Sequence, residues 1–234
     1  MSFSDPAGSP SWWARMRRGL LLGLVATLAA CSPGGGGGAD VTIGQGAPDP
    51  VAAVEDLRTL LAAGDFGGAS SLAVPGQAVL ASLAEGAAPS TVAAALDSSD
   101  GQVAANFWSG FAQGVGGALS QEATLEDLGT TSEEGIEFFV VGVTPEGGAQ
   151  RVMVTRDVDG QRIDLFATFG AGLAEGMIPS VDLLLTSSNE DSGQILAALQ
   201  DVVPSLLVAA RDETLSPDAS QRILQLVEMI TRAG

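Results

Sequence analysis

The chain has 234 residues and a formal net charge of −18, because 28 acidic residues stand against ten arginines and there is no lysine and no histidine. A chain with so few cations is a poor partner for nucleic-acid phosphates. The absence of histidine, lysine and tyrosine excludes a Ser-His-Asp triad, a histidine-bound zinc ion, a lysine Schiff base and a phenolic oxyanion donor. We therefore expect no nucleic-acid partner, no cofactor and no metal site.

Carboxylates are the remaining means of catalysis. Three acidic pairs are adjacent in sequence: Glu133 with Glu134, Glu190 with Asp191, and Asp212 with Glu213. General acid-base work needs a carboxyl group that is desolvated in a cleft, whereas these pairs fall in predicted loops or at a helix end. We expect no enzymatic activity, and a carboxylate-dependent hydrolase is the least favoured alternative.

Residues 1–30 have the layout of an export signal. Three arginines, Arg15, Arg17 and Arg18, precede an apolar run over residues 19–30. As a helix this run spans about 18 Å, which is short of the roughly 30 Å hydrocarbon core of a membrane. A signal peptide is therefore favoured over a spanning helix. The paired arginines also fit a twin-arginine signal, so both export routes stay open.

The end of the apolar run carries the most specific motif of the chain. Leu28, Ala29, Ala30 and Cys31 resemble the lipobox of bacterial lipoproteins, and Cys31 is the only cysteine. The resemblance implies cleavage before Cys31, lipid on its thiol, and a protein held by that lipid at the extracytoplasmic face of the cell membrane. The alternative is an ordinary secretory signal with an incidental cysteine.

Composition divides the remainder in two. Residues 31–48 contain five consecutive glycines and few apolar side chains, which predicts a flexible tether with a reach of roughly 23 Å. Residues 49–234 have the length and apolar content of a single α+β domain.

Helices come first in that domain. Asp49 and Pro50 form a cap and first turn, and apolar residues keep helical spacing up to a stop at Gly64. Further helical pieces are expected from Asp65, over residues 75–85, over 90–96 with Ser90 as the cap, and over 101–120.

After these helices, from residue 123 onward, the spacing of the apolar residues becomes that of β-strands. Four antiparallel strands are predicted over residues 123–129, 136–144, 151–158 and 161–169. A two-residue turn at Asp159 and Gly160 and a turn over residues 145–148 set the predicted register. The expected partners are Phe139 with Val154, Glu137 with Arg156, and Asp157 with Arg162.

This register predicts which side chains share a face. One face carries Phe139, Val141, Val143, Val152, Val154, Ile163, Leu165 and Ala167, and the other carries Ile136, Phe138, Val140, Met153 and Phe166. Neither face is wholly polar, so helices before and after the sheet are expected to cover them. Those after it are predicted over residues 177–185, 192–211 with a break near Pro204, and 217–232 with Ser216 as the cap.

Two stretches resemble turns of the NTF2-like (cystatin-like) domains of exported lipoproteins. They are Leu60 to Phe66, with its Ala-Gly-Asp-Phe turn, and Asp159 to Leu165, a terminal hairpin. The resemblance covers residues 50–170 and implies an NTF2-like domain with a helical extension. Arg162 stands where the family has tryptophan, and about 60 C-terminal residues fall outside the pattern.

These observations predict a membrane-anchored cell-envelope protein whose domain binds a small molecule or an envelope protein without catalysis. A cavity between sheet and helices is expected, with six candidate lining residues: Phe107, Trp108, Phe111, Phe139, Val154 and Arg156. Arginines of the sheet form an anion site or, as the favoured interpretation, pair with acids on the next strand. The alternative function is a scaffold that acts through a sheet face or through the C-terminal helices.

Overall fold

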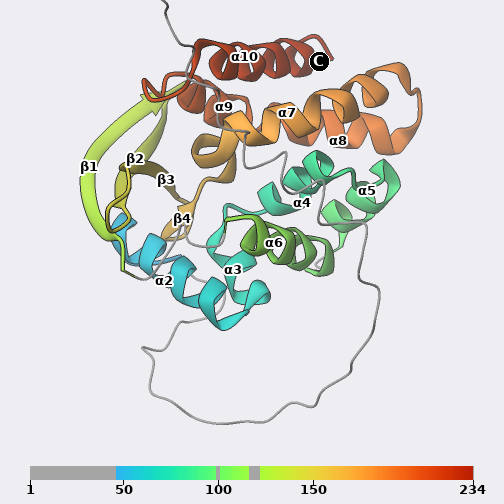
Figure 1. Ribbon diagram of the computed structural model, residues 1–234. Helices are drawn as coiled ribbons and strands as arrows, with labels where there is room; N and C mark the ends of the chain where they lie inside the picture. The colour runs from blue at the N-terminus through green and yellow to red at the C-terminus, as the bar shows by residue number, and fades with distance from the viewer. Residues whose placement is uncertain (1–45, 99–100, 116–121, 234) are drawn as a thin grey trace, which may run out of the picture.

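The structure is a computed structural model that describes residues 46–98, 101–115 and 122–233. Cys31, the lipobox residues 28–30 and most of the expected tether lie outside these residues. Within them, helices precede and follow a four-stranded antiparallel sheet with the strand order β1-β2-β3-β4 (Figure 1). The chain is therefore α+β, as the sequence predicts.

The helices before the sheet follow their capping signals. They are α2 (Pro50–Ala63), α3 (Phe66–Leu72), α4 (Gln77–Ala81), the 3-10 helix η1 (Ser82–Glu85), α5 (Pro89–Asp97) and α6 (Gln102–Val115). The Asp49 side chain accepts a hydrogen bond from the backbone N–H of Ala52 at 2.8 Å, and Gly64 ends α2 with a φ of 71°. The prediction that Ser90 caps α5 is wrong. Ala88 is the cap, because Pro89 fits the first turn of a helix.

The fold begins before Asp49. The backbone of Ala47 forms an antiparallel bridge with Gln161, and the N–H of Gly46 donates to the carbonyl of Asp159 at 2.9 Å. A Cβ on Gly46 would lie 2.5 Å from the carbonyl carbon of Gly160, so this contact requires glycine. The end of the expected tether is thus part of the sheet edge.

The four strands are β1 (Thr124–Glu133), β2 (Ile136–Thr144), β3 (Arg151–Asp157) and β4 (Gln161–Ile163). The first is longer than predicted because Gly129 does not end it. The ladder shifts by one residue between Asp127 and Gly129, where Gly129 adopts a φ of 93° and donates its N–H to the Asp127 carboxylate at 2.8 Å. The strand passes this bulge and continues.

The loops at both ends of β3 hold one residue more than predicted. Phe139 consequently lies opposite Thr155, and Asp157 lies opposite Gln161. A slip of one residue moves a strand's side chains to the other face. The predicted face sets are therefore wrong: Val154 packs with Phe138, whereas Val141 and Met153 are paired across the strands.

The fourth strand ends six residues earlier than predicted. The buried Asp164 accepts a hydrogen bond from the N–H of Ala167 at 2.9 Å and caps α7 (Leu165–Thr186). Leu165 and Ala167, predicted in a strand, thus form the first turn of a helix. The helix runs through Gly170 and Gly176, which allow close contact with Ala209 and Ala84.

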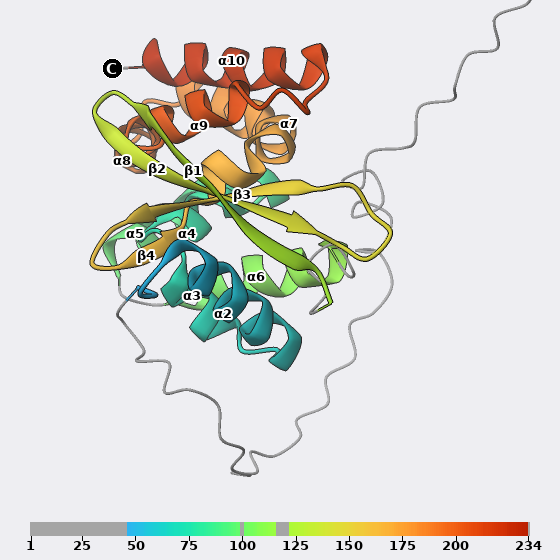
Figure 2. The ribbon, with the colours of Figure 1, turned by 90° about the vertical axis from the view of Figure 1, so that its left-hand side faces the viewer.

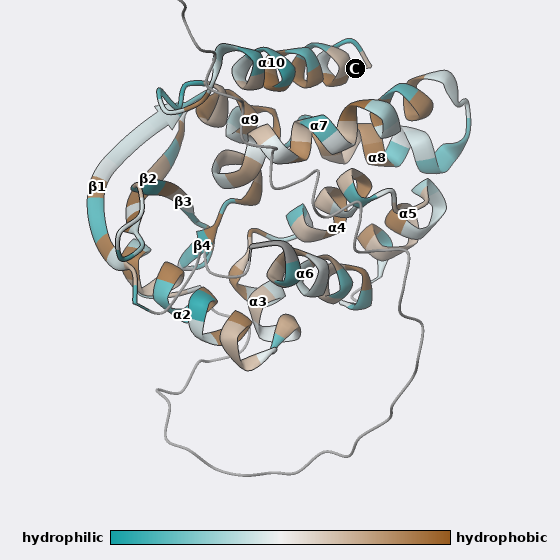
Figure 3. Cartoon of the chain, viewed as in Figure 1, coloured by the Kyte–Doolittle hydropathy of each residue, from teal (hydrophilic) through white to brown (hydrophobic). Residues whose placement is uncertain are grey.

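The chain ends in α8 (Glu190–Gln200), α9 (Val203–Ala210) and α10 (Pro217–Thr231). The break near Pro204 is confirmed, since α8 and α9 are bent by 51°. Ser216 caps α10 as predicted. Polar and apolar residues alternate along α10 (Figure 3), whose buried residues are Ile223, Leu226 and Ile230.

Helices cover both faces of the sheet, as expected. On one face Phe138 and Val154 pack with Ala167 of α7, and Val208 of α9 lies against them. On the other, Val141 and Met153 join the main core, to which the helices before the sheet contribute. In Figure 1, α2 lies at one end of the curved sheet, and α9 and α10 lie at the other.

Candidate ligand-binding site

The aromatic residues predicted to line a pocket form the core instead. Phe107, Trp108 and Phe111 of α6 are at most 1% exposed. The ring centroids of Trp108 and Phe111 are 5.3 Å apart in an edge-on arrangement. Those of Phe111 and Phe169 of α7 are 4.8 Å apart. These contacts are typical of packed aromatic side chains. The prediction that this trio lines a cavity is therefore corrected.

Phe139 and Val154 do not face a common cavity either. The register places Thr155 opposite Phe139, so Val154 points to the other face of the sheet. Val154 is 3% exposed and belongs to the small cluster of Phe138 and Ala167. Of the six predicted lining residues, Phe139 and Arg156 line a pocket in the described structure.

That pocket lies where the sheet splits. The ladder between β2 and β3 ends at the Phe139–Thr155 pair, and beyond it each strand is paired only with its outer neighbour. Figure 2 shows the tips of the β1–β2 and β3–β4 hairpins lying apart. We call the space between them the split pocket.

Contacts at the two hairpin tips hold them apart. Glu133 of the β1–β2 tip forms an ion pair with Arg211, which ends α9. At the other tip, Ala47 pairs with Gln161, and Arg162 donates to the carbonyl of Ser71. One tip is therefore tied to the C-terminal helices and the other to the N-terminal segment.

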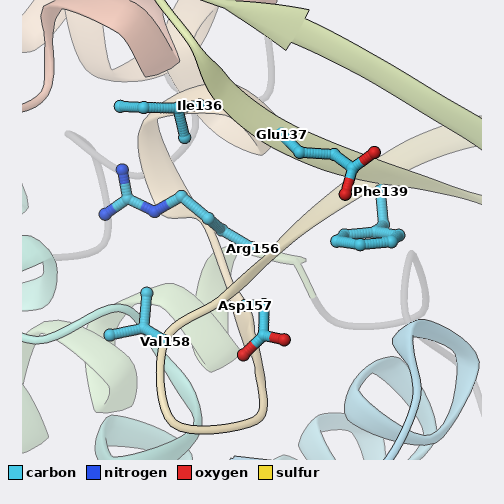
Figure 4. Close-up of a pocket in the computed structure, with 6 residues that line it drawn as sticks. All are labelled: Ile136, Glu137, Phe139, Arg156, Asp157 and Val158. Atoms are coloured by element: carbon cyan, nitrogen blue, oxygen red, sulfur yellow. The ribbon is translucent and has the colours of Figure 1, made fainter.

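The split pocket has a volume of about 410 Å³, within the usual range of small-molecule sites. Its lining residues are Ile136, Glu137, Phe139, Arg156, Asp157 and Val158. Consecutive residues of a strand point to opposite faces, so a pocket lined by both Ile136 and Glu137 extends through the sheet. Figure 4 shows Arg156 with Ile136 and Val158 on one side, and Glu137, Phe139 and Asp157 on the other.

Arg156 is the least exposed of the charged residues that line the split pocket. Its side chain is 17% exposed, and its Nε lies 3.9 Å from Oδ2 of the buried Asp164. That carboxylate also accepts hydrogen bonds from the N–H of Ala167 and from Ser205 Oγ, at 2.9 and 2.8 Å. The buried Arg156 Nε has no hydrogen-bond partner. Asp164 therefore compensates the Arg156 charge without saturating its donors.

The predicted cross-strand partners of the two arginines, Glu137 for Arg156 and Asp157 for Arg162, are wrong. Arg156 lies directly opposite Arg162 on β4, and Glu137 points to the other face of the sheet from Arg156. The Arg162 Nε donates to the carbonyl of Val158 at 2.8 Å. Arg156 and Arg162 thus share one face beside the split, where the sequence predicted an acid opposite each.

Glu85 is the carboxyl group most altered by its surroundings, and it lies outside the split pocket. It ends η1, and a Cβ on Gly110 of α6 would lie 3.0 Å from its Oε1. The residue as a whole is exposed, but the partial burial of its carboxylate against α6 raises its pKa to about 7.

This raised pKa predicts a pH effect. The folded state holds the Glu85 proton more tightly than the unfolded state, so its contribution to stability is complete below about pH 4.5 and falls as pH rises through 7. We expect the free energy of unfolding of Glu85→Gln to rise relative to that of the wild type when the pH is raised from about 5 to about 8. Urea unfolding at both values measures this, with the exposed Glu213→Gln as control. Equal wild-type-to-variant differences at the two values contradict it.

The described residues were compared with the requirements of a membrane span and of a metal site. No single helix among them is long and apolar enough to cross a membrane, although α8 and α9 pass that test of length and composition as a bent pair. In the same residues, no group of three or more acidic or cysteine side chains is arranged to hold a metal ion.

Comparison with known proteins gives no relative. No family model, no curated protein and no solved structure matches this chain. The resemblances to bacterial lipoproteins and to NTF2-like domains therefore stay predictions.

Sequence reasoning missed the split pocket and four of its lining residues. They are Ile136, Glu137, Asp157 and Val158. One signal was present: Glu134 and Gly135 form a tight turn with φ values of 50° and 81°, so β1 and β2 make a hairpin of their own. The early end of β4 had a signal too. Asp164 precedes an apolar run, which is the position of a residue that caps the start of a helix.

Proposed function

We propose that this chain is a membrane-anchored, extracytoplasmic binding protein that does not catalyse a reaction. Lipid on Cys31 holds it at the cell membrane, the glycine-rich residues after Cys31 form a tether, and the split pocket binds a small molecule. The observation that carries the binding role is Arg156, a charged side chain that lines a cavity of small-molecule size and whose nearest carboxylate, Asp164, also accepts two other hydrogen bonds.

A binding pocket is favoured over a scaffold that acts through a sheet face. The middle strands carry buried residues on both faces, with Phe138 and Val154 on one and Val141 and Met153 on the other. Neither face of the sheet centre is thus left for a partner. The opening between the hairpins gives direct access to polar and charged groups instead.

The anchor is tested by Cys31→Ala in the full-length chain, expressed in a bacterium that processes lipoproteins. We expect the wild type in the membrane fraction, labelled by a palmitate analogue, and the variant unlabelled and released from the membrane, because the thiol is the site of acylation. Ser32→Ala is the matched control and keeps the label. A labelled, membrane-held Cys31→Ala chain overturns the anchor.

A further inference from the structure

The Arg156 side of the split pocket is suited to an anion. The Arg156 guanidinium lies between Ile136 and Val158 (Figure 4), and the Asp164 carboxylate near it is shared with Ala167 N–H and Ser205 Oγ. Arg162 lies directly opposite on β4, on the same face. A guanidinium in such a site holds a carboxylate through two parallel hydrogen bonds.

The other side of the split pocket has the opposite charge. Glu137 and Asp157 are exposed, and Figure 4 shows them near Phe139, away from the Arg156 guanidinium. These carboxylates, and a chain of net charge −18, repel a ligand that is only anionic. They attract a cationic group, which the face of the Phe139 ring also favours.

The walls between the two charged ends are apolar. Ile136, Phe139 and Val158 are each half-buried in the lining. A ligand whose anion lies at Arg156 and whose cation lies at the acids on the other side must pass these side chains. Its binding is most favourable when its middle part is apolar, because contact with these side chains then removes apolar surface from water.

We propose that the split pocket selects a zwitterionic small molecule, with a carboxylate at Arg156, an apolar middle part along Ile136, Phe139 and Val158, and an ammonium group at Glu137 and Asp157. This inference rests on the proposed binding function and adds the chemical class of the ligand.

Three probes of matched size test the class. They are 6-aminohexanoate, hexanoate and hexylamine, titrated calorimetrically into the full chain in a mild detergent. We expect 6-aminohexanoate to bind about ten-fold more tightly than either probe with a single charge, because each charged contact contributes separately. Equal affinity for hexanoate or hexylamine overturns the zwitterion, and so does the absence of binding by all three.

Variants assign the two ends. Arg156→Gln is expected to lower the affinity for 6-aminohexanoate about ten-fold or more, and Glu137→Gln several-fold. The exposed controls Arg151→Gln and Glu126→Gln are expected to keep an affinity within about two-fold of the wild type. Arg156→Gln also removes the charge that faces the buried Asp164, so this variant can lose stability as well as affinity. Glu137 is exposed, so Glu137→Gln tests the inference even if Arg156→Gln misfolds. Unchanged affinity in Glu137→Gln overturns the inference.

The chain purified from membranes separates an error in the ligand class from an error in the binding function. If none of the three probes binds but the purified chain carries another small molecule, the binding function stands and only the ligand class is wrong. If the probes fail and the purified chain carries no bound molecule, both are overturned.

Discussion

Asp164→Ala is expected to destabilise the protein by about 3 to 5 kcal/mol. Asp164 is fully buried, and its carboxylate caps α7 through the N–H of Ala167. It also accepts a hydrogen bond from the buried Ser205 hydroxyl and faces the Arg156 Nε. Its removal costs the cap, leaves Ser205 without an acceptor and leaves Arg156 without its nearest carboxylate.

The controls separate these contributions. Asp49→Ala removes an exposed cap of α2 and should cost only about 1 kcal/mol. Asp164→Asn keeps an oxygen that can cap α7 and removes the charge that faces Arg156, so we expect an intermediate loss. Urea unfolding monitored by circular dichroism measures all three variants. A loss in Asp164→Ala no larger than in Asp49→Ala contradicts the buried network.

Gly176→Ala is expected to destabilise by about 1 to 3 kcal/mol, although alanine is the better helix former. A Cβ at position 176 would lie 2.4 Å from the carbonyl oxygen of Ala84 and 2.9 Å from its Cα. Both are backbone atoms of η1, so relief requires α7 and η1 to move apart. One turn later, Ser180 Oγ donates to the carbonyl of Leu83 at 2.9 Å, and this bond opposes such a movement.

Gly193→Ala is the matched control within the same molecule. Gly193 lies in α8, and a Cβ there would meet nothing within 4 Å. Alanine should therefore stabilise the protein by about 0.5 to 1 kcal/mol through helix propensity alone. The two substitutions are chemically identical and differ only in surroundings, so shifts of opposite sign are expected in a thermal melt. A stabilising Gly176→Ala contradicts the close contact.

Three helix ends were predictable because their signals are local. Asp49, Gly64 and Ser216 act through backbone groups within a few residues, and the structure has each in its predicted role. The break near Pro204 was predictable for the same reason. The α+β class follows from the change of period between the two sets of helices.

Register was not predictable, because it depends on loop lengths that composition leaves open. Asp159 and Gly160 mark a turn, yet Val158 also belongs to the loop, and this single residue moves Arg162 from its predicted partner Asp157 to Arg156. The start of α7 failed for another reason. Leu165 and Phe166 are both fully buried, which suits a strand covered on both faces as well as a helix entering the core.

The split pocket could not be located from the sequence, because it forms where β2 and β3 stop pairing. Glu137 and Asp157 belong to strands that read as one continuous meander. The contacts that separate the hairpins, Glu133 with Arg211 and Ala47 with Gln161, join positions far apart in the chain. Only tertiary structure brings these positions together.

Native mass spectrometry of the full chain, extracted from the membranes of a lipoprotein-processing bacterium, tests the account of an anchored binding protein most directly. We predict a chain that begins at Cys31, carries acyl groups, and holds an additional small molecule that Arg156→Gln releases while Arg151→Gln does not. A chain that retains residues 1–30 or a free Cys31 thiol, with no bound molecule, contradicts it.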